Sequence, residues 1–315
     1  MDVSTNMTSL NSLRNDVERM VLELRGNLNF NSTNFSFPYK QSIKFKNGFV
    51  LNTEKLGREF VRKLLVLSND HSVEFNDVRT NSQQWILNTN DFSLILPNNL
   101  KFVFDSIDPL IFTETFLYDI HFVGFDLNEK VVIDAGGFVG DTALYYANLG
   151  AEVFTFEPDP VHFNLLKRNL QLNPQVSSKI HPINSALGPD GIFKFGKDSE
   201  HIGKISENGF GDYEVESLSL EKVLDKFKID SPYLLHLDIK GSEGSILESP
   251  AIRKFSKLRV EYSPYLTNSY DTNIDYPEWI HNTVRAHGFQ KTRLFKHNHL
   301  NIPMSVHGTL DASKE

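Results

Sequence analysis

A glycine-rich turn at residues 134–142 carries the first residues of this sequence whose types and spacing could hold a ligand. The apolar run Val131–Ile133 leads into Asp134, and Gly136 and Gly140 follow before a helix-forming stretch. Glycine lets a backbone approach a ligand closely and adopt positive φ, and the first turn of a helix offers unbonded N–H groups. The pattern predicts either a nucleoside site between a strand and a helix or a turn that only packs the helix onto the strand.

The spacing of these glycines argues against a dinucleotide cofactor. Such cofactors need Gly-x-Gly-x-x-Gly, whose middle glycine makes room for the pyrophosphate. Read from Gly136, the middle position is Phe138 and the third is Asp141, and the reading from Gly137 fails in the same way. The turn instead suits a cofactor without phosphate that is cationic at sulfur and carries an ammonium and a carboxylate.

Two later segments add residues suited to a nucleoside. Glu157 ends the next apolar run, 17 residues after Gly140. A carboxylate at this strand end can accept hydrogen bonds from both ribose hydroxyls. Ser185 and Ala186 follow a third strand and could line an adenine slot, although an ordinary loop is the simpler interpretation of these two residues alone.

Two further acids, Asp238 and Glu243, follow the apolar run Leu234–Leu237. Carboxylates in this position can bind a substrate hydroxyl, accept its proton or hold a cofactor ammonium. We expect one of the two to accept the proton, and Asp238 to contact the cofactor. No further acidic ligands accompany them, so no metal site is predicted. His236 lies between leucines in the strand and is interpreted as a core histidine.

The elements that must position these residues alternate between strands and helices from residue 130 onward. This alternation predicts an α/β fold with a doubly wound, mostly parallel sheet, whose ligands lie beyond the carboxyl ends of the strands. We expect strands at 131–134, 152–157, 180–183, 192–196, 213–218, 234–238 and 258–262, and helices at 142–148, 160–170 and 278–287.

The first part of the chain has a different pattern and is expected to form an α+β extension. We therefore predict two domains, an extension over 1–125 that binds an acceptor or mediates assembly, and a catalytic domain over 126–315. In the extension we expect a helix over 10–24, a loop over 27–37, paired strands at 43–45 and 49–51 around Asn47-Gly48, a helix after Thr53, a meander over 84–104 and a helix from Asp108 through Phe116.

Composition narrows the function further. The 315 residues are 40% hydrophobic with 25 Phe, which is ample for a packed core. The net charge is -8, and acids outnumber bases in both parts, with 12 Lys and Arg against 14 Asp and Glu in residues 1–125 and 20 against 26 in the rest. Nucleic-acid binding needs a basic track, so no nucleic-acid partner is expected. The absence of Cys excludes disulfides, Cys-ligated metals and thiol nucleophiles. Without a secretory signal or a long apolar run, we expect a cytoplasmic protein with no membrane span.

Taken in order, these motifs resemble the FkbM family of S-adenosylmethionine-dependent methyltransferases. The resemblance covers roughly residues 105–262, and Lys240 stands where the family usually has Glu, while Gly137-Phe138 replaces a common Ala-Asn. The segments that carry it are Asp134-Ala-Gly-Gly-Phe-Val-Gly-Asp141-Thr, Phe156-Glu157-Pro158-Asp159-Pro160, Asn184-Ser-Ala-Leu-Gly188, Ser217-Leu-Ser-Leu-Glu221 and Leu237-Asp238-Ile-Lys-Gly241-Ser-Glu243.

The resemblance implies a class I methyltransferase fold, which is Rossmann-like, S-adenosylmethionine as cofactor, and usually O-methylation of a hydroxyl on a sugar or secondary metabolite. We expect a small-molecule or glycan acceptor, with Asp238 and Glu243 as catalytic candidates. Alternatives are a nucleic-acid methyltransferase and a non-catalytic cofactor-binding module. The residues expected to bind the cofactor are Asp134, Gly136, Gly140, Asp141, Thr142, Glu157, Pro158, Asp159, Ser185, Ala186 and Asp238.

Overall fold

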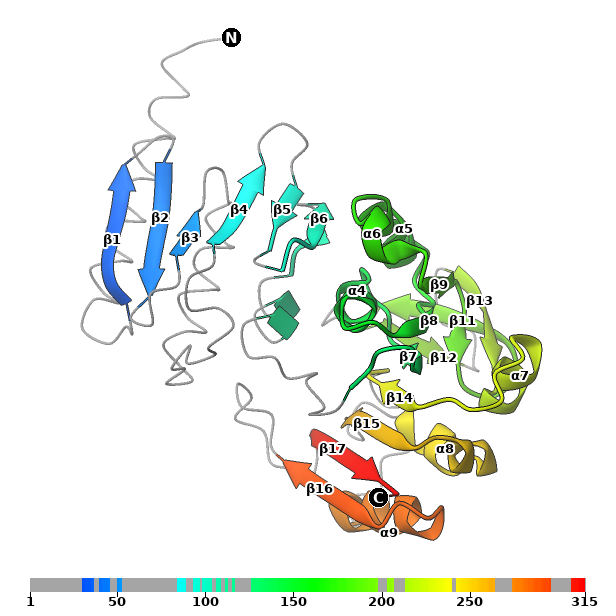
Figure 1. The fold of residues 1–315 in the computed structure, drawn as a ribbon. Helices are drawn as coiled ribbons and strands as arrows, with labels where there is room; N and C mark the ends of the chain where they lie inside the picture. The colour runs from blue at the N-terminus through cyan, green and yellow to red at the C-terminus, as the bar shows by residue number, and fades with distance from the viewer. Residues whose placement is uncertain are drawn as a thin grey trace. The chain divides into compact units, whose positions relative to one another are not determined.

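The chain divides into two structural units, Met1–Ile120 and His121–Glu315, and each is treated separately below. Figure 1 shows the fold of the computed structural model, coloured along the chain. The residues that the structure describes are 30–36, 40–45, 50–52, 84–88, 93–96, 98–103, 106–108, 111–112, 115–116, 126–197, 203–206, 213–239, 242–263, 274–295 and 307–314.

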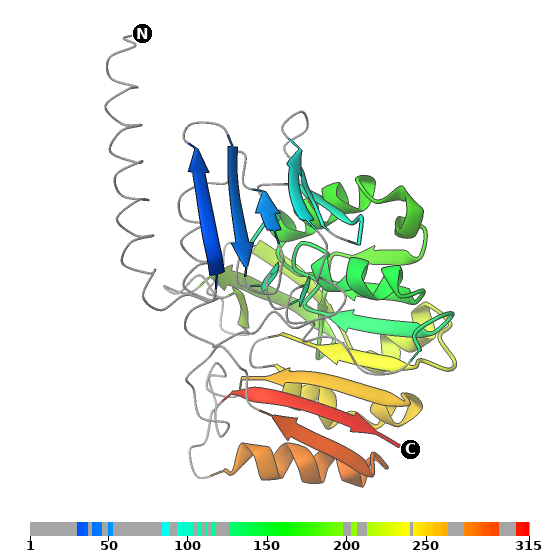
Figure 2. The ribbon, with the colours of Figure 1, turned by 60° about the vertical axis from the view of Figure 1, so that its left-hand side comes forward.

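The N-terminal unit contains a six-stranded sheet whose spatial order follows the chain. Its strands are β1 (Phe30–Ser36), β2 (Lys40–Phe45), β3 (Val50–Asn52), β4 (Gln84–Asn88), β5 (Ser93–Ile95) and β6 (Lys101–Val103). Neighbours are antiparallel except β3 and β4, which are parallel. The predicted strand pair and the predicted meander are therefore confirmed, and β1 and β2 are seen side by side in Figure 2.

Residues 30–36 form a strand, so the prediction of a loop over 27–37 is wrong for this stretch. β1 pairs with β2 from Phe30 opposite Phe45 to Ser36 opposite Lys40. Asn and Ser favour turns as isolated residues, but the ladder of hydrogen bonds to β2 outweighs that local preference. The predicted helices over 10–24 and after Thr53, and the turn at Asn47-Gly48, lie outside the described residues.

The predicted helix that begins at Asp108 is described only in part. The Ile111 N–H donates to the Asp108 carboxylate over 3.2 Å, and the Phe112 N–H donates to the Asp108 carbonyl over 3.0 Å. Asp108 therefore caps a helical turn, as the sequence indicates. The Phe112 ring meets Phe102 edge-on at 4.7 Å, and Phe116 lies 5.5 Å from Phe102, so the turn is anchored to β6 by aromatic contacts.

The C-terminal unit is built on a seven-stranded sheet with the order β16-β17-β15-β14-β7-β8-β9. All of these strands run parallel except β17, which is antiparallel to both neighbours. The prediction of a doubly wound, mostly parallel sheet is confirmed (Figure 1). The strands are β7 (Val131–Ala135), β8 (Glu152–Phe156), β9 (Ile180–Ile183), β14 (Leu234–Leu237), β15 (Lys257–Tyr262), β16 (Lys291–Phe295) and β17 (Gly308–Ser313).

Two predicted strands belong to a second, smaller sheet. β11 (Gly191–Lys197) and β13 (Tyr213–Leu218) pair antiparallel, and they are joined by β10 (Ala186–Leu187) and β12 (Gly203–Ser206) in the order β10-β13-β11-β12. β11 and β12 form a hairpin. The predictions at 192–196 and 213–218 are thus correct as strands, but these residues are not part of the parallel sheet.

Helices cover both faces of the seven-stranded sheet. α4 (Asp141–Asn148), α5 (Pro160–Gln171) and α6 (Pro174–Ser177) contact one another near β7, β8 and β9. The other face is apolar and packs against α7 (Leu220–Lys226), α8 (Glu243–Leu247), the 3₁₀ helix Pro250–Lys254 and α9 (Tyr276–Ala286). α9 lies beside β16 in Figure 2. The predicted helices at 142–148, 160–170 and 278–287 are confirmed as α4, α5 and most of α9.

The strand order places a switch point between β7 and β14. From β7 the chain builds outward through β8 and β9, and it then returns to β14 on the other side of β7. Ligands of doubly wound sheets bind at such a point, beyond the carboxyl ends of the strands. Here the two backbones approach closely, because the Asp238 N–H donates to Ala135 over 2.9 Å and a Cβ on Gly136 would lie 2.0 Å from the Asp238 carbonyl oxygen.

We predict that Gly136→Ala strongly destabilises the protein. Gly136 has φ +92, and the added methyl would collide with backbone that belongs to another strand end. Gly288→Ala is a matched control, because Gly288 has φ +97 but nothing lies within 4 Å of the position that a Cβ would take there. Left-handed backbone costs an L-residue roughly 1–2 kcal/mol, and overpacking adds roughly 1–3 kcal/mol. Urea unfolding should show this extra loss for Gly136→Ala only, and equal losses would contradict the close contact.

Candidate functional site

The glycine turn between β7 and α4 is fixed by backbone hydrogen bonds. The N–H groups of Gly136 and Gly137 both donate to the Phe156 carbonyl, over 3.0 and 2.9 Å, and the Gly140 N–H donates to Gly137 over 2.7 Å. From α5, the buried Asn169 side chain donates to the Val139 carbonyl over 2.8 Å. The turn therefore has a defined shape before any ligand binds.

Phe138 occupies a left-handed position in this turn, with φ +42. Such backbone is uncommon for residues other than glycine and asparagine. The Phe138 N–H donates to Glu157 Oε2 over 2.8 Å, and its ring meets the His162 imidazole edge-on at 4.5 Å. A hydrogen bond to the Glu157 side chain thus holds the middle of the turn.

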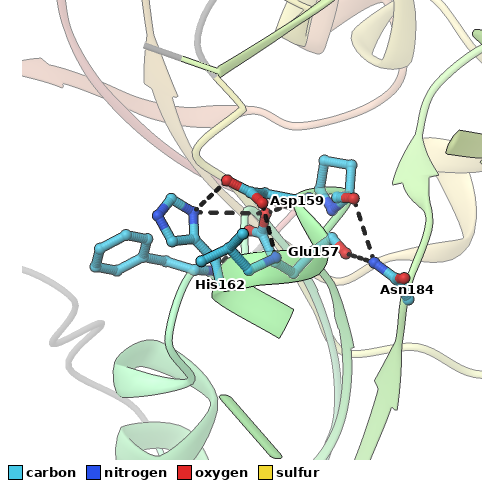
Figure 3. Close-up of polar contacts among 7 residues, drawn as sticks. Glu157, Asp159, His162 and Asn184 are labelled. Carbon is cyan, nitrogen blue, oxygen red and sulfur yellow. Dashed lines mark hydrogen bonds and ion pairs between the residues drawn. The ribbon is translucent and has the colours of Figure 1, made fainter. Parts of the chain in front are cut away.

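Glu157 connects the turn to the start of α5. Its other oxygen, Oε1, accepts the Asp159 N–H over 2.8 Å, and Asp159 in turn caps α5 by accepting the Val161 N–H over 2.8 Å. His162 Nδ1 lies 3.4 Å from Asp159 Oδ2 and 3.9 Å from Glu157 Oε1. On the other side, the Asn184 amide donates to the carbonyls of Glu157 and Pro158 (Figure 3). Glu157 is therefore held at its carboxylate by two backbone N–H groups and at its main-chain carbonyl by Asn184.

Burial dominates the protonation of Glu157, whose side chain is almost completely enclosed. Burial raises the pKa of Glu157 to about 8, against the opposing effect of the two backbone hydrogen bonds, and the charges of Asp159 and Asp134 raise it further. A donor pair that approaches the free lone pairs of this carboxylate, such as a ribose diol, would favour the ionised form.

Asp134 lies in β7, two residues before Gly136 of the turn, and is fully buried. Its Oδ2 accepts the Thr155 hydroxyl over 2.7 Å, and its Oδ1 lies 2.8 Å from His236 Nδ1. The Tyr146 ring of α4 packs edge-on over His236 at 5.6 Å. His236 is a buried histidine of the sheet, as predicted, but it is also the partner of a carboxylate. The side chain of Asp134 is engaged within the sheet, while in the turn that follows it Gly136 and Phe138 are partly exposed.

These contacts belong to a longer polar row across the sheet. Each residue of the row is the register partner of the next. Arg259 is buried, pairs with Asp311 and stacks over the Phe295 ring at 4.8 Å. The row, which we call the polar row, consists of Thr155, Asp134, His236, Arg259, Asp311 and Arg293.

The two candidate catalytic carboxylates differ in their surroundings. Asp238 follows β14 directly, is partly exposed, and lies beside Gly136 at the switch point. Glu243 begins α8 and is fully buried. Burial and the charge of Glu243 raise the pKa of Tyr276 in α9 above its usual range, so Glu243 lies against α9. The structure therefore brings only Asp238 next to the glycine turn.

The remaining candidates are placed around the same edge. Asp141 and Thr142 form the first turn of α4, and both are buried. Ser185 lies between β9 and β10, Ala186 begins β10, and both are buried. Within the part of the chain that the structure describes, the Ser185 hydroxyl has no hydrogen-bond partner. A buried hydroxyl without a partner is costly, so this atom is suited to receive a polar ligand group.

Three contributing residues were missed by sequence reasoning. Asn169 and Thr155 looked like ordinary members of an apolar helix and strand, and only the packing shows that they bond to the turn and to Asp134. A polar residue on the buried face of a predicted element was the signal that could have found them. His162 gave no signal, because its neighbours Phe138 and Asp159 come from separate parts of the turn and cap.

Metal ligands and membrane-spanning helices are both absent from the described ranges. No group of three or more His, Asp or Glu there is arranged to hold a metal ion. None of the helices in those ranges is long and apolar enough to cross a membrane.

A family model for the FkbM methyltransferase domain matches residues 134–291, half of the chain. The chain belongs to the FkbM methyltransferase family. The matched segment begins at Asp134, and it contains the glycine turn, Glu157 and Asp238. No curated protein sequence is significantly similar to the chain.

Solved structures show similar folds at low identity. An FkbM methyltransferase from Methylobacillus flagellatus is 20% identical with a TM-score of 0.40, and the match covers 63% of this chain and 47% of that one. This chain thus spans about half of that protein. Fibrillarin from Aeropyrum pernix, solved with bound S-adenosylmethionine, is 11% identical with a TM-score of 0.40, covering 90% and 99%. Magnesium protoporphyrin IX methyltransferase from Synechocystis, also with the cofactor, is 13% identical with a TM-score of 0.34, covering 60% and 72%.

The site of this FkbM methyltransferase fits its cofactor. Gly136 has no side chain, which lets the glycine turn lie directly against the Asp238 carbonyl. Glu157 offers a fixed carboxylate for a diol, and the Ser185 hydroxyl is a buried polar atom without a partner among the described residues. Glu157 and Ser185 thus provide polar groups of the kind that a ribose and an adenine need.

We predict that the ligand-free protein loses stability as pH rises from about 4.5 to about 8 through the titration of Glu157. The folded state holds this proton more tightly than the unfolded state. Glu157 therefore contributes most to stability at low pH, and this contribution disappears as the pH rises through the pKa of the folded state. Its slope is at most about 1.4 kcal/mol per pH unit. Urea unfolding of wild type and Glu157→Gln across this range isolates it, since Gln does not titrate. Parallel curves for both proteins would contradict the raised pKa.

We predict that Thr155→Val destabilises the protein by about 1–3 kcal/mol, because it leaves a buried oxygen of Asp134 without its donor. Thr292→Val is the control, since the Thr292 hydroxyl bonds His281 over 2.8 Å but is only partly buried. Its loss should be no more than about 1 kcal/mol. Chemical denaturation compares the two variants, and a larger effect at Thr292 would argue against the polar row as a major stabilising feature.

Proposed function

We propose that this methyltransferase moves the methyl group of S-adenosylmethionine to a hydroxyl of a small molecule or glycan. The observation that carries the proposal is the position of Asp238, a partly exposed acidic residue at the switch point beside Gly136. A hydroxyl is a poor nucleophile until its proton has an acceptor, and a carboxylate at the reacting edge supplies one.

The cofactor supplies an electrophilic methyl group on a cationic sulfur. Glu157 is suited to accept both ribose hydroxyls, and the Ser185 hydroxyl with Ala186 is suited to the adenine. The glycine turn and the first residues of α4, Asp141 and Thr142, border the remaining part. Pro158 and Asp159 contribute by shaping the backbone that holds Glu157, since Asn184 bonds Pro158 and Asp159 caps α5.

Asp134 acts in this proposal through the turn that follows it. Its carboxylate oxygens are engaged by Thr155 and His236, which fixes the level at which β7 ends. A buried, paired carboxylate of this kind is a positioning residue for Gly136 and Gly137. It also adds negative charge beneath a cationic cofactor, because its field extends to Glu157.

Of the two catalytic candidates, Asp238 is proposed as the proton acceptor and as a contact of the cofactor. Glu243 is proposed to have a positioning role, because it holds α8 against Tyr276 in α9. The support is the difference in exposure, because Glu243 is fully buried and Asp238 is partly open. Methyl transfer is an in-line displacement, so the acceptor oxygen must also be aligned with the methyl–sulfur bond.

The division of the chain extends the proposal to the acceptor. Residues 126–315 carry the methyltransferase site, and residues 1–125 are proposed to bind the acceptor or to mediate assembly. The net charge of -8, with acids in excess in both parts, favours an uncharged acceptor such as a sugar over nucleic acid.

We predict that Asp238→Asn lowers kcat by about 10²–10⁴-fold, the range for loss of a general base. Release of S-adenosylhomocysteine would be measured with a panel of methyl glycosides, other polyols and, for comparison, tRNA. Asp225→Asn, an exposed acid of α7, serves as the control and should keep full turnover. Turnover with tRNA alone would overturn the hydroxyl acceptor, and bound cofactor without turnover on any acceptor would favour a non-catalytic module.

A further inference from the structure

Phe138 is held in a conformation that its side chain does not favour. Its φ of +42 lies in the left-handed region, which costs an L-residue roughly 1–2 kcal/mol. Its position also corresponds to the middle glycine of dinucleotide-binding turns. A bulky residue with strained backbone at a ligand-binding turn points to a role for its side chain.

Packing in the core does not account for the Phe138 ring. The ring is only partly buried, and so is His162, the imidazole that it meets edge-on at 4.5 Å. Both rings therefore keep exposed surface at the carboxyl edge of the sheet. Neither belongs to the apolar cluster that packs α7, α8 and α9 onto the other face.

The Phe138 backbone and the His162 imidazole both lie beside the carboxylate of Glu157, and the Phe138 ring packs against the imidazole. Glu157 accepts the backbone N–H of Phe138, and His162 Nδ1 lies 3.9 Å from the same carboxylate and 3.4 Å from Asp159 (Figure 3). A ribose hydroxyl both donates and accepts hydrogen bonds. Ionised Glu157 can only accept, so a complete set of contacts to a ribose also needs a donor close to Glu157. His162 Nδ1 faces Asp159 and Glu157, so Nε2 is the imidazole nitrogen that could donate to a ribose.

We propose that Phe138 and His162 form a further binding surface for the nucleoside part of S-adenosylmethionine. Phe138 supplies an apolar wall for the sugar and base, and His162 supplies a hydrogen-bond donor beside the Glu157 carboxylate. This inference rests on the cofactor site described under the proposed function, but it does not depend on the identity of the methyl acceptor.

The test measures binding of S-adenosylhomocysteine and of adenosine to the full chain by calorimetry. His162→Ala and Phe138→Asn should each weaken both ligands by roughly fivefold to tenfold, about 1–1.4 kcal/mol. Asn tolerates the left-handed backbone, so Phe138→Asn removes the ring while keeping the turn. His162→Phe keeps a ring without a donor and should fall between wild type and His162→Ala.

His181→Ala is the matched control. His181 also pairs with a glutamate, Glu152, over 2.9 Å, and it stacks on an aromatic ring, Phe154, at 4.3 Å, but it lies at the amino end of the same strands. It should leave both affinities unchanged. Thermal melts without ligand establish that each variant is folded.

Three outcomes would overturn the proposal. Unchanged affinity in His162→Ala and Phe138→Asn would show that the two rings do not bind the nucleoside, and it would leave the proposed cofactor site itself unaffected. A loss for S-adenosylhomocysteine but not for adenosine would place the rings at the amino-acid part instead. Failure of the wild-type chain to bind either ligand would overturn this inference together with the cofactor site on which it rests.

Discussion

The polar row is the feature on which the rest of the C-terminal unit depends. A carboxylate such as Asp134 is very costly to bury unless each oxygen has a partner. Thr155 and His236 provide those partners from the strands on either side, so β8, β7 and β14 are locked in one register. A shift by one residue would turn the carboxylate into the apolar face. The row therefore specifies which residues reach the carboxyl edge together.

The site follows from that register. Two residues beyond Thr155, Asp134 and His236, directly after the ends of β8, β7 and β14, come Glu157, Gly136 and Asp238. Residues two apart along a strand lie on the same face of a sheet. The site therefore lies on the same face as the polar row, one step further toward the carboxyl ends of the strands. The turn is then completed by backbone bonds to Phe156 and by Asn169 from α5. Little reorganisation remains to be made when a ligand binds, which is the condition for precise alignment in a displacement reaction.

The sequence predicted the parts of this arrangement that depend on local patterns. Strand and helix alternation indicated the doubly wound sheet, and glycine spacing separated a sulfonium cofactor from a dinucleotide. It could not predict that Asp134 turns into the sheet, because that depends on Thr155 and His236, which are 21 and 102 residues away. β16 and β17 were missed because one is a charged edge strand and the other is rich in small polar residues, so neither shows a clear apolar alternation. The loop predicted over β1 was wrong because a neighbouring strand decides the structure of an Asn- and Ser-rich segment.

The position of β17 has a consequence for how the protein is made. β17 follows β16 in the chain but lies between β15 and β16, so β16 can join the sheet only together with β17 or after it. Arg259 in β15 forms its ion pair with Asp311 in β17, which is 52 residues later in the chain. A ribosome releases the chain from the amino end at a limited rate, so this arginine leaves the exit tunnel well before its partner. The edge of β15 therefore stays unpaired until β17 has been synthesised. During that interval this edge must not pair with strands of other chains.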